Sequence, residues 1–230
     1  MKVIGLIGGM SWESSAVYYR LLNERVGDLL GASHSCECIM DSVDFAYIER
    51  LQHDGKWKEL CHIMKDKALK LEKAGAEIIL LCTNTMHVCT PEMTRDLKVP
   101  FLHIADATGK AIVSKGLSRV GLLGTRFTME KDFYSKILKE KYKVEVIIPK
   151  AEDREIIHSC IYKELVRGEF SPVSKREFQR IIADLQKKGA EGVILGCTEI
   201  PMLIQQSDVD IPVFDTTSLH VDAALEGALN

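Results

Sequence analysis

The sequence predicts an α/β protein of two pseudo-symmetric lobes, each built on a parallel sheet. Short apolar segments alternate with longer segments in which apolar residues have helical spacing, as in parallel sheets with crossover helices. Two of the apolar segments, 78–81 and 193–196, contain no polar residue, which is typical of strands covered on both faces. Several segments also recur in one order along the chain, which indicates a repeated structural unit.

The first part of the chain alternates between strands and helices. A Gly8-Gly9 turn ends the first strand, and because glycine lets backbone N–H groups approach a ligand closely, we expect a small anion there. Gly75 ends the helix before the strand 78–81, as a C-cap does. The expected elements are a strand over 2–7, a helix from about Ser14, a strand over 34–43, a helix over 57–73 and a strand over 78–81.

The same alternation continues to the end of the chain. After a helix that follows His87, we expect strands over 100–104, 120–124, 144–148, 193–196 and 212–214. The helices between and after them are expected over 105–114, 129–140, 153–166 and 174–188, with a last helix from about Ser218.

Three pairs of segments point to an internal duplication. The pairs are marked by Gly5 and Gly121, Gly75 and Gly189, and Pro100 and Pro212, which lie 112 to 116 residues apart. Each pair keeps its place relative to an expected strand, so we read two similar lobes with the active site in the cleft between them. We expect the first lobe over 1–98 plus 212–230 and the second over 99–211, with the last strand and helix returning to the first lobe.

Composition excludes several classes of protein. A net charge of -3 gives no electrostatic footprint for nucleic acid or an anionic membrane. No apolar run approaches the roughly 20 residues that a membrane-spanning helix needs, and the first residues lack the layout of a signal peptide. Seven cysteines, an odd number, indicate reduced thiols rather than a disulfide framework. We therefore expect a cytoplasmic protein with a small-molecule partner and no nucleic-acid or membrane partner.

Cys82 and Cys197 stand out because each follows one of the two apolar strands and precedes a threonine. Ligands of open α/β sheets bind just past the carboxyl ends of the strands. Backbone N–H groups and a helix start are expected to stabilise a thiolate there. A thiolate facing a thiol supplies a base on one side of a carbon and an acid on the other, which suits racemisation without a cofactor.

The other cysteines are interpreted as structural. His34, Cys36 and Cys38 share one face of the expected strand 34–43, but a half-buried strand face explains them better than a metal site. Cys61, Cys89 and Cys160 have no counterpart in the other lobe and are read in the same way. We therefore expect no bound metal.

Three motifs resemble those of the aspartate/glutamate racemase family, in its aspartate racemase and broad-specificity amino-acid racemase branch. They are Gly8-Gly9-Met10-Ser11-Trp12-Glu13-Ser14, Cys82-Thr83-Asn84-Thr85-Met86-His87 and Gly196-Cys197-Thr198-Glu199. The resemblance covers essentially the whole chain. It implies two α/β lobes, PLP- and cofactor-independent two-base catalysis, and a homodimer.

The same resemblance implies roles for individual residues. Cys82 and Cys197 are the catalytic thiols, and Gln52 lies near the substrate. Glu199 either orients the substrate ammonium or assists Cys197, and its alternative role is that of a carboxylate at a helix start. The residues implied to bind the substrate's α-carboxylate and amino groups are Met10, Thr83, Asn84, Thr85 and Thr198.

Substrate choice rests on basic residues. Aspartate racemases hold the side-chain carboxylate with a basic pair; Arg50 matches its first member, and Arg167, with Lys163 as the alternative, stands for the second. Each is also consistent with a solvated helix charge. If the arginines line the site, the substrate is an acidic amino acid, and L- and D-aspartate are the expected pair.

Three other functions stay open on the sequence. One is a broader racemase that acts on glutamate or neutral amino acids, and another is a diacid isomerase or decarboxylase on the same scaffold. The third is a binding module with vestigial thiols. Gly9-Met10 and Cys197-Thr198-Glu199 differ from the Asp-Ser and Cys-Thr-His of glutamate racemases, which argues against a dedicated glutamate racemase.

Overall fold

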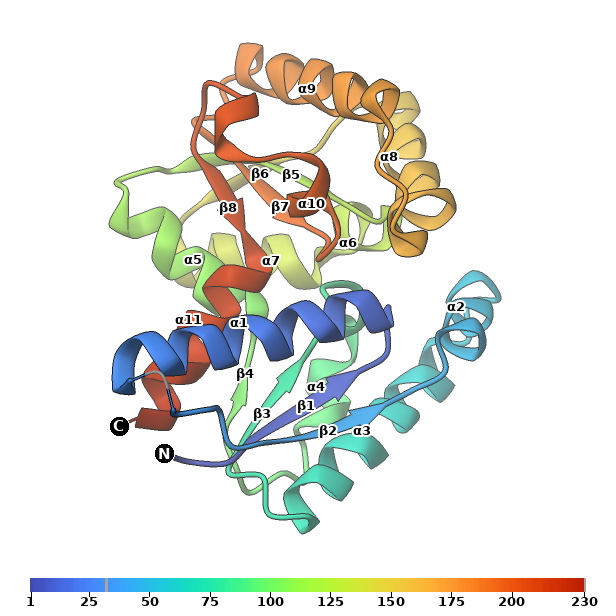
Figure 1. Ribbon diagram of the computed structural model, residues 1–230. Helices are drawn as coiled ribbons and strands as arrows, with labels where there is room; N and C mark the ends of the chain where they lie inside the picture. Colours follow the sequence, from blue (N-terminus) through green and yellow to red (C-terminus); the bar gives the residue numbers. More distant parts are fainter. Residues whose placement is uncertain (32, 230) are drawn as a thin grey trace. The chain divides into compact units, whose positions relative to one another are not determined.

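The computed structural model describes residues 1–31 and 33–229. The chain divides into two compact units, Met1–His103 with His220–Asn230 and Ile104–Leu219. Each unit is built on a sheet of four parallel strands with helices on its faces (Figure 1). The predicted α/β class is confirmed.

The first unit has strand order β2-β1-β3-β4. All three strand pairings are parallel, so the carboxyl ends of the strands lie at one edge of the sheet. The elements are β1 (Ile4–Gly8), α1 (Trp12–Leu30), β2 (Cys38–Ser42), α2 (Phe45–His53), α3 (Trp57–Lys73), β3 (Ile78–Leu81), the 3₁₀ helix η1 (Thr85–Cys89), α4 (Thr90–Met93) and β4 (Phe101–Leu102).

The second unit repeats this topology with strand order β6-β5-β7-β8, again all parallel. Its elements are α5 (Ile104–Ser114), β5 (Arg119–Gly124), α6 (Arg126–Glu130), α7 (Asp132–Tyr142), β6 (Glu145–Ile147), α8 (Ala151–Lys163), η2 (Leu165–Arg167), α9 (Pro172–Lys187), β7 (Gly192–Gly196), α10 (Ile200–Leu203), η3 (Gln206–Asp208), β8 (Val213–Asp215) and α11 (Thr216–Leu229). The two sheets therefore have equivalent strand orders, as the internal duplication predicts.

The expected lobe boundaries place two edge strands in the wrong sheet, one at each point where the chain passes from one lobe to the other. We expected the strand over 100–104 in the second lobe, but β4 pairs with β3 in the first sheet. We expected the strand over 212–214 to return to the first lobe, but β8 pairs with β7 in the second sheet. Each edge strand pairs with the buried strand that precedes it in the sequence. The chain passes from the first unit to the second at the start of α5 and returns within α11.

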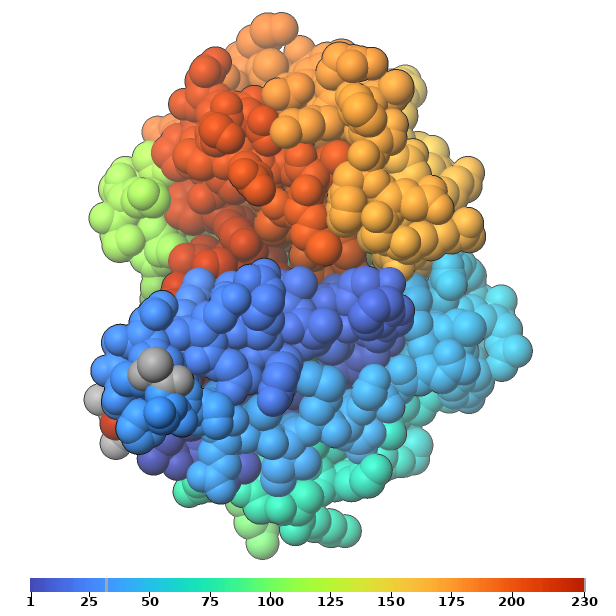
Figure 2. Space-filling model, in the orientation of Figure 1, coloured from blue at the N-terminus to red at the C-terminus, as the bar shows by residue number. Residues whose placement is uncertain are grey.

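Successive side chains along the strands of the first sheet point to opposite faces, and helices pack on both faces. Ile4, Leu6 and Leu80 pack with α1 and α11 on one face, whereas Ile7 and Ile79 pack with α3 on the other. Because both faces are covered, the strands are apolar throughout. Much of the exposed surface of this unit in Figure 2 belongs to α1.

Several predicted elements differ in detail. The strand expected over 34–43 begins only at Cys38, and α2 was not predicted as a helix. The helix expected over 129–140 is two helices that meet at Lys131, whose backbone is extended. In the part of the chain that the structure describes, no helix is both long and apolar enough to cross a membrane.

A disulfide joins Cys61 on α3 to Cys89 on η1. The expectation that all thiols are reduced is therefore wrong for this pair. The two residues are 28 positions apart, and their Cα atoms come within 4.7 Å because η1 packs against α3. The sequence does not reveal this contact, since neither cysteine has a motif partner.

Candidate functional site

The first thiol loop begins where β3 ends. The amide of Cys82 donates to the carbonyl of Ile7 on β1 at 2.9 Å, which extends the pairing of these strands by one residue. The Cys82 side chain is fully buried, in the cluster that also contains α1 and α11. The chain then turns, with the Thr83 amide donating to Leu81, and enters η1 at Thr85.

The residues implied to bind substrate follow directly in this loop. Thr83, Asn84 and Thr85 are buried although all three are polar. Gln52 lies on α2 and is also buried, and its amide donates to the sulfur of Met86 in η1 at 3.2 Å. The structure therefore places Gln52 against η1, the short helix that follows the thiol loop.

The second thiol loop follows β7 and contains a hydrogen-bonded triplet. The Cys197 thiol donates to Glu199 Oε2 at 2.9 Å, and the Thr198 hydroxyl donates to the same oxygen at 2.9 Å. Cys197 is 8% exposed, and Glu199 is 2% exposed. Of the roles open for Glu199 from the sequence, this geometry favours the one in which it assists Cys197.

Both thiols are harder to ionise than an ordinary cysteine. Burial raises the pKa of Cys82, with a smaller contribution from Cys38. The pKa of Cys197 is also raised, first by burial and then by the charge and hydrogen bond of Glu199, against backbone hydrogen bonds that lower it. We expected backbone N–H groups and a helix start to favour the thiolate; at these buried positions desolvation is the larger effect. A thiolate at either position therefore needs a proton acceptor within reach, and the Glu199 carboxylate lies within hydrogen-bond distance of the Cys197 thiol.

Arg50 lies on α2 and is exposed, with its guanidinium carbon 5.3 Å from the centre of the Tyr47 ring. Gln52, on the same helix, is buried. Met10 is likewise buried, in the cluster that contains α3 and Met86. Of the two candidate residues on α2, Gln52 contacts Met86 of η1, and Arg50 lies on the surface beside Tyr47.

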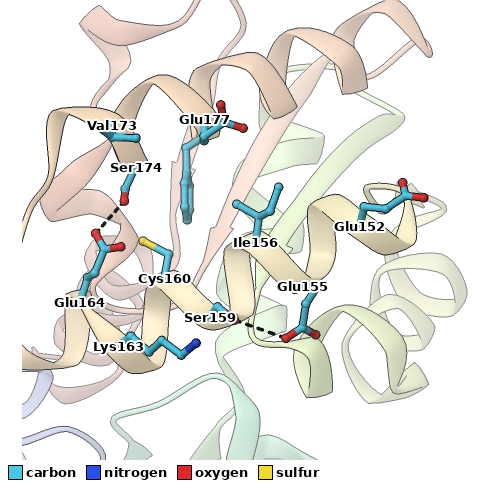
Figure 3. Close-up of a pocket in the computed structure, with 11 residues that line it drawn as sticks. Glu152, Glu155, Ile156, Ser159, Cys160, Lys163, Glu164, Val173, Ser174 and Glu177 are labelled. Carbon is cyan, nitrogen blue, oxygen red and sulfur yellow. Dashed lines mark hydrogen bonds between the residues drawn. The ribbon is translucent and has the colours of Figure 1, made fainter.

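In the second unit, the candidates for the other basic contact lie at the end of α8 and in η2. Arg167 is exposed in η2. Lys163 lines a cavity of about 390 Å³ between α8 and α9, together with Cys160 and Glu164 (Figure 3). Glu164 accepts a hydrogen bond from Ser174 of α9 at 2.6 Å. This cavity does not include the Cys197 loop.

The Gly8-Gly9 turn does not have the role that we expected. Gly9 has a φ of 89°, and a Cβ atom there would lie 2.3 Å from the carbonyl oxygen of Val43. Its amide donates to the Ser15 hydroxyl at 2.7 Å. The glycine is therefore needed for a left-handed turn against the chain that follows β2, and its N–H binds Ser15 rather than an anion.

The expected strand face with His34, Cys36 and Cys38 is only partly formed, because β2 begins at Cys38. A hydrogen bond from Cys36 lowers the pKa of Cys38 to about 7. Among residues 1–31 and 33–229, no group of three or more His, Cys, Asp or Glu side chains is arranged to hold a metal ion.

Three buried histidines form a cluster that contacts the first thiol loop through His87, and no sequence motif predicted this cluster. His87 of η1 lies with its ring centre 4.5 Å from that of His103 and 5.9 Å from that of His220. His220 Nε2 donates to the carbonyl of Leu102 at 2.9 Å, so its Nδ1 accepts from the Tyr18 hydroxyl, also at 2.9 Å. Burial lowers the pKa of His220 to about 4, which makes the ring neutral at pH 7, with its proton on Nε2.

This cluster predicts a loss of stability in acid. Burial lowers the pKa of His220 from 6.5 to about 4, and burial also lowers the pKa of His87. Below about pH 6.5 these histidines bind protons in the unfolded chain but not in the folded protein. The free energy of unfolding therefore falls as the pH is lowered toward 4. For His220 alone we expect a loss of about 2 to 3 kcal/mol between about pH 7.5 and pH 4.5.

Urea unfolding at these two pH values measures the loss, with His220→Gln as the comparison. Glutamine keeps a donor for Leu102 and does not titrate. The variant should be less stable at neutral pH and show a smaller difference between the two pH values. An unchanged difference would contradict a buried, neutral His220.

Comparison with known proteins gives a consistent result. Residues 7–224 match the family described as Asp/Glu/hydantoin racemase. The crystal structure of a candidate Asp/Glu racemase from Yersinia pestis is 46% identical, with a TM-score of 0.92 and full coverage of both chains. An aspartate racemase homologue from Pyrococcus horikoshii is 37% identical, with a TM-score of 0.86 and full coverage of both chains. The broad-specificity amino-acid racemase RacX of Bacillus subtilis is 26% identical over 94% of this chain and 93% of its own length.

Proposed function

Because this chain belongs to the Asp/Glu/hydantoin racemase family, we propose that it is a PLP-independent amino-acid racemase that interconverts L- and D-aspartate. The observation that carries the proposal is the pair of Cys-Thr loops at the carboxyl ends of equivalent strands. Cys82 follows β3 in one sheet, and Cys197 follows β7 in the other. A redox or binding role does not require the same residue pair at both positions.

In the proposed reaction, one thiolate removes the α-proton of the substrate and the other thiol returns a proton to the opposite face of the carbon. Inversion follows from the change of face, and the two sulfurs are the groups that exchange protons directly with the α-carbon. The Cys197–Glu199 hydrogen bond provides the path by which Cys197 loses its proton before it acts as the base. When Cys197 acts as the acid, its thiol already carries the proton to be delivered.

The loop residues are proposed to bind the part of the substrate that all amino acids share. Thr83, Asn84 and Thr85 of the first loop and Thr198 of the second are proposed to supply hydroxyl, amide and backbone donors to the α-carboxylate and acceptors to the ammonium. Arg50, with Arg167 or Lys163, is proposed to bind the side-chain carboxylate. Because this basic pair would bind a side-chain carboxylate, the proposed substrate is an acidic amino acid.

Arg50 provides the test of substrate choice. Arg50→Ala should lower kcat/KM for aspartate by about 10²-fold, because a charge-assisted hydrogen bond is lost, and should leave neutral amino acids unaffected. Chiral chromatography of both enantiomers measures the rates. Arg20→Ala is the matched control, since Arg20 is an exposed arginine that pairs with Glu24 on α1. Equal aspartate kinetics in the wild type and Arg50→Ala would remove Arg50 from the site.

A second candidate function is a broad-specificity racemase. The similarity to RacX along nearly the whole chain favours it. The candidate predicts comparable kcat/KM values for aspartate, glutamate and several neutral amino acids. The aspartate proposal instead predicts that aspartate exceeds the neutral amino acids by at least about tenfold.

The experiment that tests the racemase proposal itself follows optical rotation of L- and D-aspartate with purified protein, without PLP and with EDTA present. Decay of the rotation from both enantiomers to zero supports the proposal. If neither aspartate nor any amino acid in a panel of acidic and neutral substrates loses its rotation, the racemase proposal is wrong. Release of CO₂ from a diacid, or its isomerisation, would then indicate the other chemistry of this scaffold.

A further inference from the structure

His87 makes two hydrogen bonds to the backbone of the first thiol loop. Its Nδ1 donates to the carbonyl of Thr83 at 2.7 Å, and its backbone N–H donates to the carbonyl of Asn84 at 3.1 Å. The side chain is 1% exposed and packs against the rings of Phe101, His103 and His220. One residue therefore holds two successive carbonyl groups immediately after Cys82.

These two bonds also set the direction of two amide groups. In a trans peptide the C=O of one residue and the N–H of the next point in opposite directions. Because the carbonyls of Thr83 and Asn84 point to His87, the N–H groups of Asn84 and Thr85 point away from it. These are the residues that follow the thiol in the motif.

The position of His87 is itself fixed from several sides. Its carbonyl accepts a hydrogen bond from the Thr90 hydroxyl at 2.7 Å. The disulfide from Cys89 to Cys61 and the contact between Met86 and Gln52 hold η1 against α3 and α2. The ring centres of Phe101 and His103 lie 5.6 Å and 4.5 Å from the ring centre of His87. η1 is thus held in place, and the two hydrogen bonds from His87 fix the loop relative to η1.

We propose that His87 is the positioning residue of the Cys82 loop, which holds the carbonyls of Thr83 and Asn84 and thereby directs the amides of Asn84 and Thr85 to the substrate carboxylate. The inference rests on the proposed racemase function and adds to it a residue that does not touch the substrate. It requires a donor at the place of Nδ1. It does not require a titrating imidazole.

Two substitutions separate the donor from the bulk of the ring. His87→Asn keeps an N–H donor near the place of Nδ1, whereas His87→Phe keeps a ring of similar size and loses the donor. We expect His87→Phe to lower kcat/KM by about 10²-fold, mainly through a higher KM, because binding of the α-carboxylate is lost. His87→Asn should stay within about tenfold of the wild type.

Tyr18→Phe is the control for a loss of stability alone. It removes a buried hydrogen bond of the same cluster, from Tyr18 to His220, and leaves in place both hydrogen bonds from His87 to the loop. Its thermal stability should fall by an amount similar to that of His87→Phe, while its KM remains that of the wild type. A merely structural role of His87 would give both variants the same kinetics.

Hydrogen exchange followed by mass spectrometry gives a readout that does not depend on a substrate. The peptide that contains 82–89 should exchange faster in His87→Phe than in the wild type, and His87→Asn should restore protection. If the wild type racemises amino acids but His87→Phe matches Tyr18→Phe in KM and in this exchange, the inference is wrong and the proposed function stands. If the wild type racemises nothing, the proposed function fails, and unchanged exchange in His87→Phe would still overturn the positioning role.

Discussion

Cys82→Ala and Cys197→Ala are each expected to lower kcat/KM for racemisation by about 10²- to 10⁴-fold, the usual contribution of a general acid or base. Each variant loses either the base or the acid in both directions of the reaction. The rates from L- and D-aspartate should therefore fall together, because the equilibrium constant between enantiomers fixes their ratio. Chiral chromatography from each enantiomer measures both rates.

Cys160→Ala is the matched control for these variants. Cys160 is also a buried cysteine, and burial raises its pKa to about 11, but it lies on α8 and lines the cavity in Figure 3, whose lining does not include Cys197. This variant should keep wild-type kinetics. If Cys82→Ala or Cys197→Ala keeps more than about a tenth of the wild-type kcat/KM, that cysteine is not one of the two catalytic groups.

Glu199→Gln is expected to have the next largest effect, a fall of about 10²-fold in kcat/KM at neutral pH. Glutamine keeps the shape of the side chain and loses the proton acceptor of the Cys197 thiol. The pKa of Cys197 is raised, so without an acceptor the thiolate forms only at higher pH. Activity of the variant should therefore rise as the pH is increased above neutral.

The sign of the change in Glu199→Gln distinguishes two roles. If Glu199 acts only through its charge, which raises the pKa of Cys197, removing the charge lowers that pKa. More thiolate would then be present near pH 7, and the variant would be as active as the wild type or more active. A pH profile of kcat/KM from about pH 6 to pH 10 separates the two outcomes, and only a loss at neutral pH agrees with a proton acceptor.

The fold was predictable because its signals are local. The strands 78–81 and 193–196 are apolar throughout since helices cover both faces of each sheet, and a cysteine follows each strand directly. The duplication identified two equivalent units but not the sheet to which each edge strand belongs. β4 and β8 are only two and three residues long, and pairing with β3 and β7 depends on contacts that the sequence pattern does not encode.

The motifs of the candidate site could be read from the sequence, but the electrostatics of its thiols could not. Cys82 and Cys197 are identified by their places after the two strands, and Glu199 by its place in the motif. The raised pKa of each thiol depends on burial that becomes visible only in the folded structure. The histidine cluster was missed because Tyr18 and His220 lie 202 residues apart and carry no shared pattern.

The central claim is that two thiols exchange protons with the α-carbon from opposite faces. Proton NMR of L- and D-aspartate in D₂O, with wild type, Cys82→Ala and Cys197→Ala, tests it most directly. In the wild type, both enantiomers should lose the α-proton signal as rotation decays. Each variant should abolish inversion, and any remaining exchange should be confined to one enantiomer, opposite in the two variants. Inversion that persists in either variant, or residual exchange of the same enantiomer in both, would contradict the two-thiol account.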